Sequence, residues 1–193
     1  LAGALAVADP IKASSARAVA ALRQMGLEVV MLTGDTQRTG EAIAREAGIA
    51  RVVADVRPEG KVEEIRRLQA AGKVVAMVGD GINDAPVLAA ADVSVAMGHA
   101  ALAAQDSADA VVASGRLQAL VDLRRSSART VRIVRQNLAW AAVYNASCIP
   151  LAMVGWLPPW AAGLGMALSS VAVILNAQRA AYAPAADAGL TRR

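Results

Sequence analysis

Two aspartates, Asp80 and Asp84, are the side chains of this sequence best suited to carry out chemistry. They lie in the segment G-D-G-I-N-D-A-P, which follows a short apolar run typical of a buried strand. Gly79 and Gly81 permit a turn that residues with a Cβ resist, and Asn83 stands between the two carboxylates. Because Mg²⁺ prefers hard oxygen ligands, usually one or two carboxylates with phosphate and water, the pattern predicts a metal-assisted phosphate site. In the alternative, Asp80 is a turn residue and Asp84 caps a helix, and either aspartate taken alone would favour it.

Thr33, Gly34, Asp35 and Lys61 form a second group suited to binding phosphate. The Thr33 hydroxyl and the backbone amides beside Gly34 can bind phosphate oxygens, and Asp35 can cap or orient this loop. Lys61 lies near the start of a predicted helix and can neutralise the charge of a phosphoryl group, although a single helix lysine is as often a solvated one. Both groups follow predicted strands, and ligands of parallel sheets bind at the carboxyl ends of strands.

The elements that must position these residues alternate between strands and helices. Short apolar runs predict strands near residues 4–8, 27–32, 51–54, 74–78, 93–97 and 110–113. The segments between the earlier strands have helical patterns that end at Gly26, Gly48 and Gly72. We therefore predict an α/β fold over residues 1–114, with a parallel sheet and helices on both of its faces.

The C-terminal part of the chain is unusually apolar. Hydrophobic residues make up 56% of the 193 residues, and residues 138–177 contain no charged side chain. Pro158-Pro159 divide this run into arms at about residues 138–157 and 160–177, each close to the length that crosses a bilayer as a helix. Tryptophans flank the break and arginines lie at both outer ends. The pattern predicts an integral membrane hairpin over residues 138–179, with residues 1–137 and the C-terminus in the cytoplasm. A buried helical hairpin in a soluble core is the alternative.

The net charge of +4 does not point to nucleic acid. The basic residues cluster in a predicted linking helix over residues 115–137, and no aromatic residues are interleaved with them as in many single-strand binders. Cys148 has no partner for an internal disulfide, and His99 is expected to be a loop residue. Residues 180–193 are predicted to be disordered. Because the chain begins with Leu1, we expect it to be a piece of a longer protein.

Several segments resemble the phosphorylation domain of P-type ATPases, a branch of the haloacid dehalogenase-like fold. They are D-P-I-K from Asp9, M-L-T-G-D from Met31, Lys61, and V-G-D-G-I-N-D-A-P from Val78. The resemblance implies Mg²⁺ as cofactor, ATP as substrate, and an aspartyl phosphate formed on a D-K-T-G-T motif that is absent from this sequence. We therefore expect the nucleophile and the nucleotide-binding domain to lie upstream. Two departures are Thr36, where the family usually has Asn or Asp, and residues 98–102, where G-x-G-x-D is common.

The predicted membrane arms carry polar and soft side chains, Tyr144 and Asn145 in the first, Met166 and Ser170 in the second. Thioether sulfur suits Cu⁺, although Asn and Ser can also pack two helices together and Met can fill a gap. The Tyr-Asn pair and the M-x-x-S-S segment resemble copper(I)-transporting heavy-metal pumps, in which the four matching residues contribute to the ion path. The resemblance implies an ATP-driven copper(I) exporter in a bacterial cell membrane, with membrane lipid and a copper chaperone as partners.

Three alternatives stay open on the sequence. The chain could belong to a membrane-anchored phosphatase of the same fold, to a pump for another heavy metal, or to a non-catalytic fragment. The absence of charged residues from 138–177 favours a monovalent ion served by neutral ligands.

Overall fold

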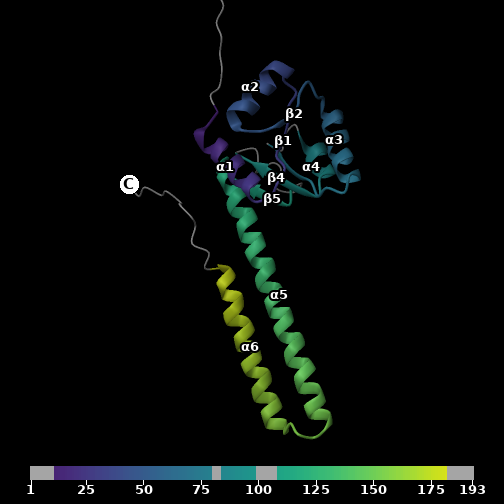
Figure 1. Ribbon diagram of the computed structural model, residues 1–193, viewed down its shortest axis with the longest axis vertical. Coiled ribbons are helices and arrows are strands. Elements are labelled where there is room, and N and C mark those ends of the chain that lie inside the picture. The colour runs from purple at the N-terminus through teal and green to yellow at the C-terminus, as the bar shows by residue number, and fades with distance from the viewer. Residues whose placement is uncertain (1–10, 80–83, 99–107, 182–193) are drawn as a thin grey trace, which may run out of the picture. The chain divides into compact units, whose positions relative to one another are not determined.

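Helices and strands alternate along the first part of the chain, as the sequence pattern predicts (Figure 1). The computed structural model describes residues 11–79, 84–98 and 108–181, which form two compact units that divide after Val121. The elements are α1 (Ala13–Gln24), β1 (Val30–Leu32), α2 (Gln37–Ala47), β2 (Arg51–Val53), α3 (Pro58–Ala70), β3 (Ala76–Gly79), α4 (Ala85–Ala90), β4 (Val93–Met97), β5 (Ala110–Val112), α5 (Gln118–Met153) and α6 (Pro159–Ala181).

Local sequence determines where α2 and α3 begin and end. The Thr36 hydroxyl accepts a hydrogen bond from the Thr39 N–H at 3.4 Å, so the predicted role of Thr36 as the cap of α2 is confirmed. Gly48 ends α2 with a φ of 74°, a left-handed conformation that is costly for a residue with a Cβ. Pro58 lies in the first turn of α3, where its missing N–H is not needed.

The described strands all pair in parallel, but they form two sheets rather than one. β1 pairs with β2, and a second sheet has the order β3-β4-β5. Among the described strands no ladder joins β1 to β3. The strand predicted at residues 4–8 lies outside the described residues. Apolar periodicity predicted strands at these positions but does not show which strands are neighbours, so the order of the described strands comes from the structure.

The interior of this part of the chain lies where α4 packs on β3, β4 and α3. Val87 and Leu88 of α4 and Ala96 of β4 are at most 1% exposed, and Ile65 of α3 is equally buried. This apolar contact holds the first turn of α4 beside the carboxyl end of β3, which is where the predicted metal ligands lie.

The second part of the chain is an antiparallel pair of long helices, α5 and α6, which run side by side (Figure 1). The predicted linking helix and the first predicted membrane arm form one continuous helix of 36 residues. Among the described residues one helix, over Pro159–Ala180, is long and apolar enough to cross a membrane, by length and composition. The apolar part of α5 is interrupted by Tyr144 and Asn145, and its crossing of a membrane stays a prediction.

Candidate phosphate and metal site

Lys61 and Asp84 form an ion pair that joins α3 to the start of α4. The Lys61 Nζ donates to Asp84 Oδ1 at 2.8 Å, and the two side chains are only 16% and 18% exposed. Lys61 is therefore not a solvated helix lysine. Asp84 precedes the first residue of α4, but its side chain makes no capping hydrogen bond. The alternatives of a solvated lysine at Lys61 and a helix cap at Asp84 do not fit this geometry, because the two side chains point toward each other.

Gly79 provides the space that the Asp84 carboxylate occupies. A Cβ added at Gly79 would lie 3.1 Å from Asp84 Oδ2 and 3.3 Å from Asp84 Cβ. The carboxylate thus lies against the bare backbone at the end of β3. Of the two carboxylate oxygens of Asp84, Oδ1 accepts from Lys61, and Oδ2 has no hydrogen-bond partner among the described residues. Oδ2 is therefore available as a hard oxygen ligand for a cation. These features fit Mg²⁺, with Asp84 as one ligand.

The other predicted ligands fall outside the described part of the chain. Asp80, Gly81 and Asn83 lie in residues 80–83, which the structure does not describe, and His99 lies in a second such segment, residues 99–107. Within the described residues no three His, Cys, Asp or Glu side chains gather into a metal cluster. The role of Asp80 as the second carboxylate therefore stays a prediction.

Thr33 and Asp35 form a closed turn at the end of β1. The Thr33 hydroxyl donates to Asp35 Oδ2 at 3.0 Å, and the Asp35 N–H donates to Thr33 Oγ1 at 3.1 Å. Asp35 thus orients the threonine, as predicted for one of its two possible roles. Thr33 is half-buried and Gly34 is exposed, so the loop presents a hydroxyl and backbone amides to a ligand. Among the described residues, no hydrogen bond links this turn to Lys61 or Asp84, and the meeting of both groups around one phosphate stays a prediction.

Asp55 was not identified from the sequence, yet it supports this turn from the loop that follows the neighbouring strand β2. Its φ of 53° makes it the one non-glycine residue with positive φ in the described part of the chain. Its N–H donates to the Asp35 carbonyl at 2.8 Å, and its Oδ2 accepts from the Gln37 N–H at 3.1 Å. The next residue, Val56, donates to the Thr33 carbonyl at 3.1 Å. Asp is among the few residues that tolerate a left-handed conformation. An aspartate directly after the predicted strand at residues 51–54 is therefore the feature that could have indicated Asp55 from the sequence.

Two carboxylates away from this edge have lowered pKa values. The side-chain hydrogen bond from Arg67 lowers the pKa of Glu64 against the opposing effect of burial, with further help from the charges of Arg67 and Arg51. The Ser94 N–H, at 2.8 Å, and the Ser94 hydroxyl, at 2.9 Å, donate to Asp109 Oδ2 and lower the pKa of that carboxyl. Both groups are ionised at neutral pH and hold elements together: Glu64 ties α3 to β2, and Asp109 ties the chain before β5 to β4.

The hairpin separates the four predicted ion-path residues onto different helix faces. Tyr144 is half-buried and faces α6, where a Cβ added at Gly165 would lie 2.7 Å from the tyrosine hydroxyl. Asn145, one position on, is exposed. Met166 is 65% exposed, and Ser170 is exposed and donates to the Met166 carbonyl at 2.9 Å. Met166 and Ser170 therefore share one face of α6, as their spacing predicts, and this face is turned away from α5.

Polar side chains also join α5 to α6, as in the alternative in which Asn and Ser pack two helices together. Asn176 Nδ2 donates to Asn137 Oδ1 at 2.8 Å, and Trp140 Nε1 donates to Ser169 Oγ at 3.0 Å. Of the two serines in the M-x-x-S-S segment, Ser169 is the one whose hydroxyl reaches α5, and Ser170 faces outward. Which of two adjacent serines faces a neighbour depends on the rotation of α6, which the sequence does not show.

Known proteins with related sequences are metal-transporting P-type ATPases. A family model described as haloacid dehalogenase-like hydrolase matches residues 1–92. The chain is 53% identical over 178 residues to a copper-exporting P-type ATPase of Bacillus subtilis (strain 168), which covers 92% of this chain and 22% of that protein. It is 48% identical over 179 residues to the copper-exporting P-type ATPase of Staphylococcus aureus (strain JH9), covering 93% and 22%. The chain thus spans about a fifth of the length of these relatives.

Solved structures agree with the sequence relatives. A zinc-transporting PIB-type ATPase in the E2.Pi state superposes with a TM-score of 0.82 at 35% identity, over 89% of this chain and 28% of that chain. The catalytic domain of a CPx-ATPase superposes with a TM-score of 0.53 at 34% identity, over 59% of this chain and 45% of that one. The predicted resemblance and the predicted fold class are both confirmed.

Proposed function

We propose that this chain, which is similar to copper-exporting P-type ATPases, is the C-terminal part of an ATP-driven copper(I) export pump. The pump would be an integral protein of a bacterial cell membrane, with residues 1–137 and the C-terminus in the cytoplasm and a copper chaperone as a partner. The nucleophilic aspartate and the nucleotide-binding domain would lie in other parts of a longer protein, since the D-K-T-G-T motif is absent here. The chain alone would then not be phosphorylated by ATP.

The ion pair between Lys61 and Asp84, set against Gly79, is the observation that carries the phosphate chemistry. Asp84 would hold Mg²⁺ together with Asp80. When bound, magnesium offsets negative charge on the phosphoryl group being transferred. Lys61 keeps the Asp84 carboxylate oriented and places a positive charge beside the same edge, where it can neutralise a phosphoryl oxygen.

The loop after β1 would bind the remaining phosphate oxygens. The Thr33 hydroxyl and the Gly34 amide are donors at the carboxyl end of a parallel strand. Asp35 and Asp55 position this loop by the hydrogen bonds described above. Strands β1 and β3 each leave one edge unpaired among the described residues, and both end at predicted phosphate-site residues. A strand that carries the nucleophile could pair there and bring its aspartate between the two groups.

The exposed side chains of the hairpin suit a path for a soft monovalent ion. Met166 offers a thioether and Ser170 a hydroxyl on the face of α6 turned away from α5, and Asn145 is exposed on α5. Further membrane helices of a longer protein could face these residues, and Tyr144 would support the path from the contact between α5 and α6. Zinc is the second candidate cargo, since one structural relative is a zinc-transporting PIB-type ATPase. The lack of charged residues in 138–177 favours copper(I).

The test is metal-stimulated ATP hydrolysis by the whole gene product that contains this chain, with Cu⁺, Zn²⁺ and Co²⁺ compared. Cu⁺ is expected to stimulate most. Met166→Leu should lower copper stimulation roughly tenfold or more, as for lost metal ligands or their supports. Met153→Leu is the matched control, because Met153 is also exposed, at 83%, but lies at the end of α5. Stimulation by Zn²⁺ alone, or equal effects of the two variants, would contradict the copper assignment. An acid-stable phosphoprotein formed by the 193-residue chain with ATP would contradict the missing nucleophile.

A further inference from the structure

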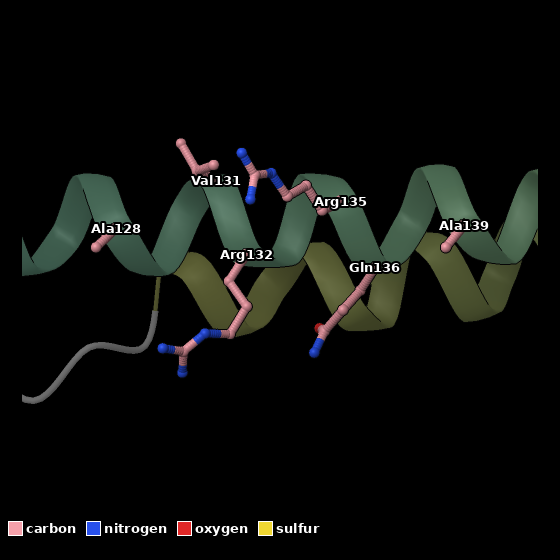
Figure 2. A pocket seen from close by; sticks show the side chains of 6 residues that line it. All are labelled: Ala128, Val131, Arg132, Arg135, Gln136 and Ala139. Carbon is pink, nitrogen blue, oxygen red and sulfur yellow. The ribbon is translucent and has the colours of Figure 1, made fainter.

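A hollow of about 480 Å³ lies on the surface of α5, ahead of the uncharged run that begins at residue 138. Small or apolar side chains and three polar ones line it, and they are Ala128, Val131, Arg132, Arg135, Gln136 and Ala139. Figure 2 shows Arg132 and Gln136 extending to one side of the helix and Arg135 to the other. The hollow therefore has a guanidinium group on each side of an alanine-rich floor.

These arginines have no acidic partner in the part of the chain that the structure describes. No ion pair involves Arg132 or Arg135, and Asp122 is the one acidic residue of α5 and α6. Both arginines are exposed. Among the described residues the positive charge of this site is not neutralised, and an anion is the ligand that its chemistry fits. Guanidinium groups bind phosphate oxygens through paired N–H donors, which makes a phosphate group the best match.

The position of the hollow along the helix decides which phosphate it meets. With a rise of about 1.5 Å per residue, Arg135 and Arg132 lie about 5 and 9 Å along the helix axis ahead of Leu138. The polar headgroup layer on each side of a bilayer is about 5–8 Å thick. If the hydrocarbon begins near Leu138, Arg135 lies within the headgroup layer and Arg132 lies just beyond its aqueous edge, from where its long side chain can reach a lipid phosphate. Arg124 and Arg125 of the same helix lie about 20 Å from Leu138, well outside that layer.

We propose that this hollow, lined by Arg132, Arg135 and Gln136, is a binding site for the phosphate headgroup of an anionic membrane lipid. The inference rests on the proposed membrane hairpin. The guanidinium groups hold the phosphate, the Gln136 amide donates to a headgroup oxygen, and Val131 with the alanines contacts the glycerol region. Positive residues near a membrane favour the cytoplasmic side in general. A hollow with Arg135 in the headgroup layer and Arg132 at its aqueous edge favours one lipid position on this helix.

The test counts lipids bound to the purified protein by native mass spectrometry in mild detergent. Phosphatidylglycerol is titrated against phosphatidylcholine. A basic residue near an anionic lipid surface strengthens binding about fivefold, so Arg132→Gln with Arg135→Gln should weaken phosphatidylglycerol binding about thirtyfold. Arg124→Gln with Arg125→Gln removes the same charge from the same helix and is the matched control, with an expected loss of about threefold or less. Replacing Arg132 and Arg135 by lysine keeps the charge without the paired donors, and an intermediate loss is expected.

Three results would overturn the proposal. Equal losses in the two double variants would mean that only diffuse charge attracts the lipid. Equal binding of both lipids to the unaltered protein would mean that the hollow is covered, for instance by an acidic segment of another part of the protein. Displacement of phosphatidylglycerol by millimolar inorganic phosphate would identify a site for free anions instead.

Copper-stimulated ATP hydrolysis by the same preparation separates this proposal from the proposed function. Selective lipid binding without copper stimulation would refute the proposed pump but support the lipid site. Copper stimulation without selective lipid binding would refute the lipid site alone. Far-UV circular dichroism checks that the glutamine variants stay folded, which is expected because both side chains are exposed. If they unfold, the lysine variants decide: a loss of phosphatidylglycerol selectivity supports the site, and unchanged selectivity overturns it.

Discussion

Separating Lys61 from Asp84 should release the first turn of α4 from α3. At 2.8 Å and an effective dielectric constant of about 20, the Coulomb attraction of such a pair is about 6 kcal/mol. Burying each charge costs several kcal/mol, but these side chains remain 16% and 18% exposed, so the cost is incomplete. We expect a net coupling of about 2 kcal/mol, within the range measured for close charge pairs. Loss of the ion pair should therefore lower the free energy of local opening around β3 and α4 by about this amount.

The assay is hydrogen–deuterium exchange of peptides that cover β3 and α4, in a double-mutant cycle of Lys61→Met and Asp84→Asn. A coupling of about 2 kcal/mol corresponds to about a thirtyfold change in exchange rate. The matched control is the exposed pair of Lys73 and Glu28, 3.6 Å apart with side chains 60% and 50% exposed. Its cycle should give less than about 0.5 kcal/mol. If both cycles give the same small coupling, Lys61 behaves as a solvated helix lysine and the reasoning about the phosphate site is refuted.

Three further predictions concern the supporting structure. Asp55→Val should destabilise the chain by about 2 kcal/mol, because a left-handed φ of 53° is costly for a β-branched residue, whereas Asp55→Asn should change the unfolding free energy little; urea denaturation measures both. Since the pKa of Asp109 is lowered, its contribution to stability is complete above the ordinary pKa of 3.8 and is lost as pH falls through the lowered value. Ser94→Ala should raise the Asp109 pKa and move acid unfolding to a higher pH, and an unchanged acid transition would contradict this. Gly165→Ala places a Cβ 2.7 Å from the Tyr144 hydroxyl, so it should force this side chain to move and change Tyr144 fluorescence or cross-linking between α5 and α6.

The types and order of the helices and strands followed from the sequence, because the signals for them are local. Thr36, Gly48 and Pro58 act on the backbone within a few residues of their own positions, and the structure has helix ends at each of them. The G-D-G-I-N-D-A-P segment, together with the D-P-I-K and M-L-T-G-D segments and Lys61, indicated the resemblance to P-type ATPases for the same reason, because such motifs can be read without knowing which elements pack together. Residues 138–177 likewise revealed a long apolar hairpin by composition alone.

Contacts between distant elements were decided by the tertiary structure. The pairing of Lys61 with Asp84 depends on α3 packing beside α4, and the support that Asp55 gives to Asp35 depends on β2 lying beside β1. The rotation of α6 turns Ser169 toward Trp140 and leaves Met166 and Ser170 outside. A sequence pattern shows which side chains share one face of a helix or strand. Which other element packs against that face depends on the packing free energy of the whole chain, and no local pattern predicts it.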